Sequence, residues 1–169
     1  MNKPIIIERL AKSHKRDRFD CGEVSLNEYI RKQASQDVKK NMSAVYVAVV
    51  DVNPLEVMGF YTLSATHIIF SHLPNEIAKS LPRYPEFPAY RIGRLAIDKS
   101  QQGKGIGKTL LMDALYKCAS QEVPVVGVIV DAKNKEVSSF YLNFGFIQLP
   151  EQPLKLFMPM KVIKNAFSR

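Results

Sequence analysis

The residues of this 169-residue chain that are best placed for chemistry are three glycines in one short loop, Gly103, Gly105 and Gly107. They lie in the segment Gln102–Thr109, between a strand-like apolar run and a helix-like apolar stripe. Because glycine has no Cβ, the backbone at these positions can come close to a ligand. The helix that begins here adds unpaired N–H groups and the positive end of its dipole. The loop therefore predicts a phosphate or pyrophosphate site.

Three phosphate-binding motifs compete for this loop. A P-loop, G-x-x-x-x-G-K-[ST], matches at its end but would need a glycine where the chain has Gln102. A dinucleotide-binding fingerprint, G-x-G-x-x-G, matches at its first two glycines but has Lys108, too large for close helix–strand packing, in third place. The acetyltransferase pattern Q/R-x-x-G-x-G/A is matched in full by Gln102, Gly105 and Gly107. On the loop alone, a nucleotide-binding module or NTPase stays an alternative, and it predicts ATP binding and Mg²⁺ dependence.

The elements around the loop are predicted from the spacing of apolar residues. A strand over 91–97 leads into the loop. A helix follows it, and its buried stripe consists of Leu110, Leu111, Ala114, Leu115 and Cys118. A strand over 125–130, a short helix over 136–144 and a last strand over 156–162 complete this half of the chain. The loop is thus held between a strand and an amphipathic helix.

The first half of the chain predicts more strands and a second helix. A β-branched run, Ile5–Ile7, predicts a strand. Ser25 and Glu28 form a capping box, which predicts a helix that starts at Ser25. The runs Val45–Val50 and Val57–Leu63 predict an antiparallel hairpin. The order of elements predicts an α/β class, with strands on both sides of a central helix.

Two further segments give the chain a family resemblance. Together with the loop, the strand Arg94–Asp98 and the run Phe140-Tyr141-x-x-Phe144-Gly145-Phe146 resemble the GNAT family of N-acetyltransferases. The resemblance implies the GNAT fold, a mixed, mostly antiparallel sheet with splayed central strands and flanking helices. It also implies acetyl-CoA as the cofactor and the transfer of an acetyl group to an amine.

A finer resemblance points to the acetyltransferase toxins of type II toxin–antitoxin pairs. The matched segments are Phe19–Gly22, Leu26–Ile30, Gln36–Asp37, Gly59–Ser64, Leu81–Pro85 and Val130–Ala132. This resemblance implies acetylation of the α-amine of aminoacyl-tRNA, which blocks translation. It implies a ribbon-helix-helix antitoxin as partner and a homodimer as assembly. An N-acetyltransferase for a small amine, a peptide or a protein is the alternative, because only the resemblance specifies the substrate.

The resemblance also assigns residues to the cofactor. The backbone of the strand 95–97 is expected to hold the acetyl and pantetheine portions, and the loop to hold the pyrophosphate. Asn134 either contacts pantetheine or caps a helix. The expected cofactor contacts are Leu95, Ala96, Ile97, Gln102, Gly103, Lys104, Gly105, Ile106, Gly107, Lys108, Asn134 and Phe140.

Tyr141 is the expected catalytic residue, chiefly on the resemblance. When an amine attacks the thioester, CoA leaves as a thiolate, and a proton donor assists its departure. A phenol with a pKa near ~10 stays protonated at neutral pH and can donate. The alternative is a core tyrosine, because Phe140 and Phe144 flank it.

No general base stands out in the sequence. An α-amine has a pKa of about 7.7–8.0, against about 10.4 for a lysine side chain, so a useful fraction is already neutral near pH 7. An α-amine substrate therefore needs less help from a base. The candidates that could act through water are Glu23, Glu28, Asp37 and Asp98.

The net charge of +8 favours polyanionic partners. With tRNA as the substrate, the expected RNA-binding residues are Lys32, Lys39, Lys40, Arg83 and Arg91. An ordinary solvated basic surface is the alternative for each of them.

The remaining features of the sequence are those of one soluble domain. Hydrophobic residues make up 46% of the chain and charged residues 24%, and the length suits a single domain over 1–169. No apolar run reaches the ~18 residues of a membrane span, and the first residues lack the apolar centre of a signal peptide. We therefore expect a cytoplasmic protein. Two separate cysteines and three scattered histidines predict no disulfide framework and no metal site.

Overall fold

The structure is a computed structural model that describes residues 4–52 and 54–168. It divides into two compact units, each made of two separate chain segments. Unit 1 comprises Met1–Ser64 with Gly93–Ala114, and unit 2 comprises Ala65–Ile92 with Leu115–Arg169. Three elements, β5, β6 and α4, run from one unit into the other along the chain. The single-domain organisation over 1–169 stays a prediction.

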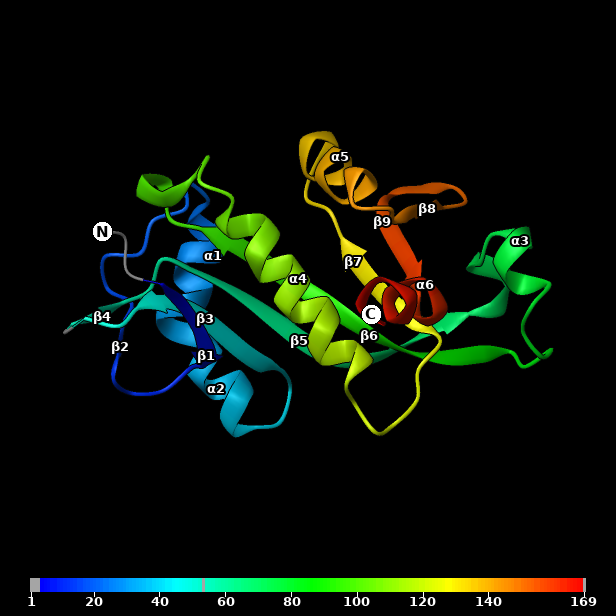
Figure 1. Ribbon diagram of the computed structural model, residues 1–169, viewed down its shortest axis with the longest axis horizontal. Helices are drawn as coiled ribbons and strands as arrows, with labels where there is room; N and C mark the ends of the chain where they lie inside the picture. The colour runs from blue at the N-terminus through cyan, green and yellow to red at the C-terminus, as the bar shows by residue number, and fades with distance from the viewer. Residues whose placement is uncertain (1–3, 53, 169) are drawn as a thin grey trace. The chain divides into compact units, whose positions relative to one another are not determined.

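The elements follow one another as an alternation of strands and short helices (Figure 1). In chain order they are β1 (Ile5–Arg9), β2 (His14–Lys15), α1 (Val24–Glu28), the π-helical turn η1 (Tyr29–Gln33), α2 (Ala34–Lys39), β3 (Ala44–Val50), β4 (Leu55–Glu56), β5 (Gly59–Ile69), the 3₁₀ turn η2 (Phe70–His72), α3 (Asn75–Ala78), β6 (Glu86–Ile97), the 3₁₀ turn η3 (Lys99–Gln101), α4 (Ile106–Ala119), β7 (Gly127–Asp131), α5 (Lys135–Asn143), β8 (Ile147–Leu149), β9 (Gln152–Pro159) and α6 (Met160–Phe167).

Unit 1 is built on strands in the order β1-β3-β5-β6. β1 pairs antiparallel with β3, and β3 pairs antiparallel with β5 from Ala44↔Leu63 to Ala48↔Gly59, which confirms the predicted hairpin. Side chains alternate across β3, so Val45 and Val47 enter an apolar cluster with Phe60. This cluster is the part of the core that carries the helical segment described next.

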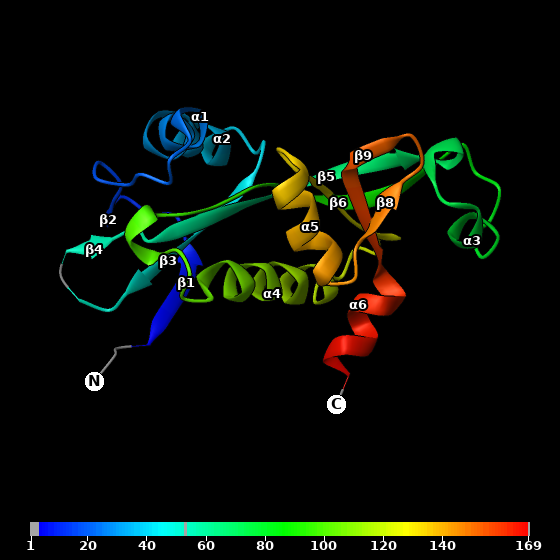
Figure 2. The same ribbon diagram turned by 90° about the horizontal axis from the view of Figure 1, so that it is seen from above.

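The first helical segment packs on one face of these strands, and the first part of α4 lies on the other face (Figure 2). The predicted capping box is wrong. Helix α1 begins at Val24 with Glu23 as its N-cap residue, and no side chain caps it, so Ser25 lies inside the helix. Tyr29 and Ile30, in the π-helical turn, are buried against the cluster together with Ala34.

Helix α4 buries the predicted stripe of Leu110, Leu111, Ala114, Leu115 and Cys118, which confirms that part of the prediction. In unit 1 it is joined to β5 by a hydrogen bond of 2.5 Å from the Tyr61 hydroxyl to Asp113 Oδ2. The close approach of the two elements explains a glycine in the strand. A Cβ added at Gly59 would lie 3.0 Å from Leu110 Cδ1 and 3.0 Å from the Ala96 carbonyl oxygen.

Unit 2 contains strands in the order β5-β6-β7-β9-β8. β6 and β7 are parallel, whereas β7 with β9 and β8 with β9 are antiparallel. The ladder between β6 and β7 runs from Tyr90↔Val128 to Ile92↔Val130, although β6 itself continues to Ile97. The ladder with β7 therefore lies entirely in the part of β6 that belongs to unit 2. The predicted α/β class, with a mixed, mostly antiparallel sheet and flanking helices, is confirmed.

The end of the chain differs from the prediction. A single strand was expected over 156–162, but β9 ends at Pro159 and helix α6 follows it. Pro159 is the N-cap residue of α6, because proline in extended geometry ends a strand and suits the start of a helix. The short strand β8 was not predicted, because three residues are too few to show an alternating pattern.

Candidate active site

The glycine loop of unit 1 starts from an aspartate that caps the preceding turn. Asp98 Oδ1 accepts hydrogen bonds from the Ser100 N–H at 3.0 Å and the Ser100 hydroxyl at 2.7 Å, and this fixes the turn η3. Helix α4 then begins at Ile106, whose side chain is buried. The loop is thus anchored at both ends, by a capped turn before it and by a core residue after it.

Two of the loop glycines have a backbone that requires glycine. Gly103 has a φ of +80° and Gly105 a φ of +82°, in the left-handed region that L side chains rarely adopt. A Cβ added at either position would have no heavy atom within 4 Å. The two glycines are therefore required by the backbone conformation and leave open space next to the loop. The packing of the core does not require them. Gly107, by contrast, lies in the first turn of α4.

The other loop residues have separate tasks. The Gln102 side chain donates to the Ile97 carbonyl at 3.0 Å and the Cys21 carbonyl at 3.2 Å, so its amide ties the loop to the chain around it. Lys104 and Lys108 are exposed, and Lys104 Nζ lies 3.5 Å from Gln101 Oε1. The first N–H groups of α4 belong to the residues after Gly105 and have no partner within the helix. The loop can thus present backbone donors and two cations to an anion.

The side chains of the strand that leads into the loop are turned to packing over 95–97. Ala96 is buried in the unit 1 cluster, and Leu95 and Ile97 are half-buried. On the same strand, the guanidinium of Arg94 lies over the Tyr29 ring at 3.7 Å from its centroid. The packed side chains leave the backbone of the strand as the group that can bind a ligand.

The candidate bases in unit 1 are engaged with their neighbours. Asp37 accepts from the Tyr29 hydroxyl at 2.9 Å, and Glu28 lies 3.9 Å from Lys32. Partial burial alone would raise the pKa of Asp98, but hydrogen bonds from Asp20 and Ser100 lower it below its usual value. Glu23 has an interaction too. None of these carboxylates is set apart as a base by its surroundings.

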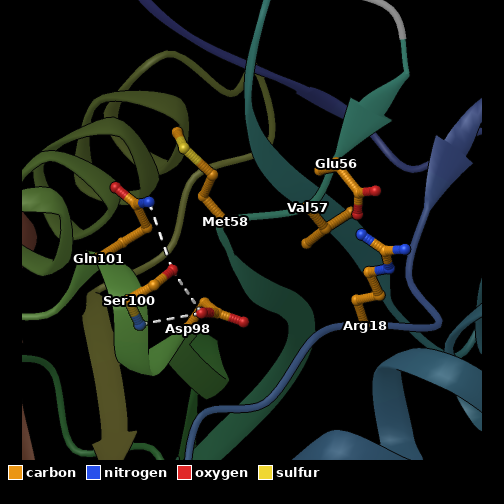
Figure 3. A pocket seen from close by; sticks show the side chains of 7 residues that line it. All are labelled: Arg18, Glu56, Val57, Met58, Asp98, Ser100 and Gln101. Atoms are coloured by element: carbon orange, nitrogen blue, oxygen red, sulfur yellow. Dashed lines mark hydrogen bonds between the residues drawn. The ribbon is translucent and has the colours of Figure 1, made fainter.

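A cavity of about 250 Å³ lies next to the start of the loop (Figure 3). Figure 3 shows Arg18 and Glu56 on one side of it and the hydrogen-bonded pair of Asp98 and Ser100 on the other. Its lining residues are Arg18, Glu56, Val57, Met58, Asp98, Ser100 and Gln101. None of the expected cofactor contacts is among them, so this cavity is distinct from the open space above the glycines.

Tyr141 belongs to unit 2, on helix α5, and is 4% exposed. Its ring makes edge contacts with Phe140 at 5.3 Å and Phe146 at 5.4 Å between centroids. Burial, and then the negative charge of Asp131, raise the pKa of Tyr141 well above its usual value. The phenol therefore keeps its proton throughout the neutral range. This suits a proton donor, and it equally suits a packed core residue.

Asn134 is the N-cap residue of α5, with Oδ1 accepting from the Val137 N–H at 3.0 Å. Of the two readings of this residue, the structure shows the helix cap. A contact with the cofactor stays a prediction for Asn134 and for Phe140, which packs against Tyr141 and Phe144.

The expected RNA-binding residues lie in both units. Lys32, Lys39 and Lys40 are exposed on or next to the helical segment of unit 1, and Arg83 is exposed in unit 2. Arg91 differs from them, because its Nε lies 3.3 Å from Asp131 Oδ2. Arg91 is therefore paired with a carboxylate and is not simply a solvated surface cation.

Sequence reasoning missed the place of Asp131, which entered only as part of a matched segment. Its position follows from the register, since Arg91 is paired with Ile129 and the next residue on the same side of β7 is Asp131. The apolar run of β7, in which Gly127–Val130 are all buried, contains no signal that could have shown this contact. Only the parallel pairing of β6 with β7 shows it.

Neither a metal site nor a membrane-spanning helix is found within residues 4–52 and 54–168. No group of three or more histidines, cysteines, aspartates or glutamates there could hold a metal ion. Over the same residues, no helix is both long enough and apolar enough to cross a membrane.

Comparison with known proteins agrees with this geometry. A family model described as an acetyltransferase (GNAT) domain matches residues 23–162. The chain is similar to a tRNA-acetylating toxin of Mycobacterium tuberculosis (strain ATCC 25618 / H37Rv), with 32% identity over 145 residues, covering 85% of this chain and 84% of that protein.

Two solved structures share its fold over nearly their whole length. The first is AtaT complexed with acetyl-methionyl-tRNAfMet, with a TM-score of 0.90 and 32% identity, covering 98% of this chain and 100% of the other. The second is a mutant AtaT toxin bound to the C-terminus of the antitoxin AtaR and acetyl-CoA. It has a TM-score of 0.82 and 30% identity, covering 98% of this chain and 99% of the other.

Proposed function

The chain belongs to the GNAT acetyltransferase family, and we propose that it transfers the acetyl group of acetyl-CoA to the α-amine of aminoacyl-tRNA. The observation that carries the cofactor is the loop, where Gly103 and Gly105 hold a left-handed backbone beside open space. The similarity to a tRNA-acetylating toxin, and to AtaT with an acetylated aminoacyl-tRNA, supports the acceptor. A nucleotide-binding role is not favoured, since the family model covers the loop.

The residues of the chain divide the chemistry between them. When bound, acetyl-CoA supplies an acetyl group activated as a thioester. We assign its pyrophosphate to the backbone donors from Gly103 to Lys108, and its acetyl and pantetheine portions to the backbone of 95–97. In the transfer, the amine nitrogen would form a bond with the acetyl carbon and lose a proton to solvent, and the carbon–sulfur bond would break. Tyr141 donates its proton to the departing sulfur and regains one from solvent.

The proposed biological role is that of a toxin that stops translation. The structure of AtaT with the C-terminus of AtaR supports an antitoxin as partner, for which we propose a ribbon-helix-helix protein. We place the reaction in the cytoplasm, where charged tRNA is used, and a homodimer is the assembly we propose.

The direct test is incubation of the protein with labelled acetyl-CoA and total charged tRNA. We expect label on the amino acid of aminoacyl-tRNA, and no dependence on ATP or Mg²⁺ in the acetylation step. Label that appears on free amines, peptides or proteins at the same rate as on aminoacyl-tRNA would show the alternative N-acetyltransferase activity.

A second expected result concerns salt and the lysines of unit 1. Replacing Lys39 and Lys40 together by glutamate should raise the KM for charged tRNA several-fold and leave the affinity for acetyl-CoA unchanged. Each lost phosphate contact should lower the slope of log affinity against log salt by about 0.7–0.9. Steady-state rates measured between about 50 and 200 mM salt give this slope.

The matched control is the double replacement of Lys161 and Lys164, both exposed on α6 and not assigned to RNA. It changes the net charge by the same amount. If both double variants lose tRNA affinity equally, the effect belongs to net charge and the assignment of Lys39 and Lys40 is wrong.

A further inference from the structure

Three charged residues share one face of the unit 2 strands, just beyond its apolar cluster. Phe87 and Ala89 on β6, Ile129 on β7 and Phe157 on β9 belong to that cluster. Side chains alternate along a strand, so the next residues on this face are Arg91, Asp131 and Lys155. The register places Asp131 opposite Lys155 across the β7–β9 ladder. Together they form what we call the charged row.

The ion pair in the charged row leaves hydrogen-bonding capacity unused on both Arg91 and Asp131. Arg91 Nε is 3.3 Å from Asp131 Oδ2, but it is buried and has no hydrogen-bond partner in the part of the chain that the structure describes. The Asp131 side chain is 40% exposed. A carboxylate can accept about four hydrogen bonds. Arg91 therefore holds one side of the Asp131 carboxylate and leaves acceptor capacity facing solvent.

Asp131 is also close enough to the proposed proton donor for the two to interact. It is the last residue of β7, and helix α5, which carries Tyr141, begins only after the connection 132–134. After burial, the charge of Asp131 is the second cause that raises the pKa of Tyr141. The carboxylate thus lies within electrostatic range of the phenol that would serve the reaction.

The charges of the row match those of the proposed acceptor. The 3′ end of an aminoacyl-tRNA carries a chain of phosphodiester anions and a single cation, the α-ammonium group. The row carries two cations and a single carboxylate. A hydrogen bond from an ammonium group to a carboxylate is charge-assisted and stronger than a neutral one.

We propose that Asp131 is a positioning residue that binds the α-ammonium group of the acceptor, with Arg91 fixing the carboxylate. The bound group loses a proton to solvent before its nitrogen attacks the acetyl carbon. Lys155, opposite Asp131 across the β7–β9 ladder, adds a second positive charge that can attract the RNA backbone. This assignment rests on the proposed function, because it takes aminoacyl-tRNA as the acceptor whose ammonium group the carboxylate binds. It gives Arg91 a task other than binding a phosphate group.

The test compares two acceptors that differ in one group. One is tRNA charged with the amino acid that the wild-type protein acetylates, and the other is the same tRNA charged with the α-hydroxy acid of the same side chain. We expect the wild-type protein to bind the amino form at least roughly 10-fold more tightly, the size of a hydrogen bond to a charged group. In Asp131→Asn this ratio should fall toward one, with unchanged affinity for acetyl-CoA.

Controls separate recognition from structure and charge. Glu122→Gln removes a carboxylate from an exposed position of unit 2 and should keep the wild-type ratio. Asp131→Glu should recover part of the ratio. If Asp131→Asn melts at a much lower temperature, Arg91→Gln provides the second variant, and its ratio should fall too, because the carboxylate loses its fixed orientation.

The outcomes also separate this inference from the proposed function. A wild-type protein that acetylates no charged tRNA overturns both. A wild-type protein that acetylates charged tRNA but binds the two forms equally, or an Asp131→Asn variant that keeps the wild-type ratio, overturns only the role of Asp131.

Discussion

Replacing Tyr141 by phenylalanine is expected to lower kcat and kcat/KM together, by ~10²–10⁴-fold, the usual contribution of a general acid. The substitution removes one hydroxyl and keeps the ring, so the edge contacts with Phe140 and Phe146 should persist. The loss would then belong to the transition state, where the departing sulfur needs a proton. Steady-state kinetics with charged tRNA and acetyl-CoA measure it.

The control for this prediction is the stability of the variant and its binding of acetyl-CoA and antitoxin. Thermal melts and titration with acetyl-CoA should give values close to those of the wild-type protein. In cells, the variant should lose growth inhibition and still bind its antitoxin. A variant that keeps most of its activity, or that loses it by unfolding, would show Tyr141 to be a core residue.

The same residue sets an expectation for the pH dependence. Burial and the charge of Asp131 raise the pKa of Tyr141, so the group ionises only at a pH above that of a free phenol, about 10. Activity should therefore show no loss from Tyr141 on the alkaline side up to about pH 10. A decline between pH 8 and 9 that disappears in Tyr141→Phe would contradict this assignment.

The second large effect is expected at Gly105. Glutamate there would place a side chain and a negative charge in the open space where we locate the pyrophosphate. A positive φ also costs an L residue roughly 1–2 kcal/mol. We expect calorimetry to detect no binding of acetyl-CoA to Gly105→Glu, and kcat/KM to fall by at least ~10²-fold, while the melt stays cooperative.

Gly105→Ala separates the two causes. Alanine pays the same backbone cost, but its Cβ meets no heavy atom within 4 Å, and it adds no charge. This variant should be destabilised about as much as Gly105→Glu and should keep far more of its affinity for acetyl-CoA. Equal losses of binding in both would mean that backbone strain, not the occupied space, is responsible. Unchanged binding in Gly105→Glu would show that the pyrophosphate lies elsewhere.

The parts of the fold that sequence could predict are those with a repeating local pattern. The helical stripe from Leu110 to Cys118 and the hairpin of β3 and β5 follow from periodicity, because each buries one face. The helix from 136 also agrees, since α5 starts at Lys135. The loop glycines were found because a tight backbone beside a ligand admits few other residues.

What the sequence could not predict depends on contacts between distant segments. Ser25 and Glu28 have the types and spacing of a capping box, but the helix starts before them, at Val24. The Gln102 amide reaches the carbonyl of Cys21, far away along the chain. The meeting of Arg91 with Asp131 needs the β6–β7 register. A local motif contains no information on such partners.

The π-helical turn Tyr29–Gln33 marks a place where this family member can vary in length. A π turn holds one residue more than an α turn, so it amounts to an insertion that the helix has absorbed. Deleting one residue here would leave a regular helix, with Ala34 still in the core and Lys39 pointing in the same direction. A deletion from a regular α-helical turn would instead rotate everything after it by ~100°. We therefore expect homologous chains to tolerate a single-residue deletion in this turn better than in a regular turn of the same segment.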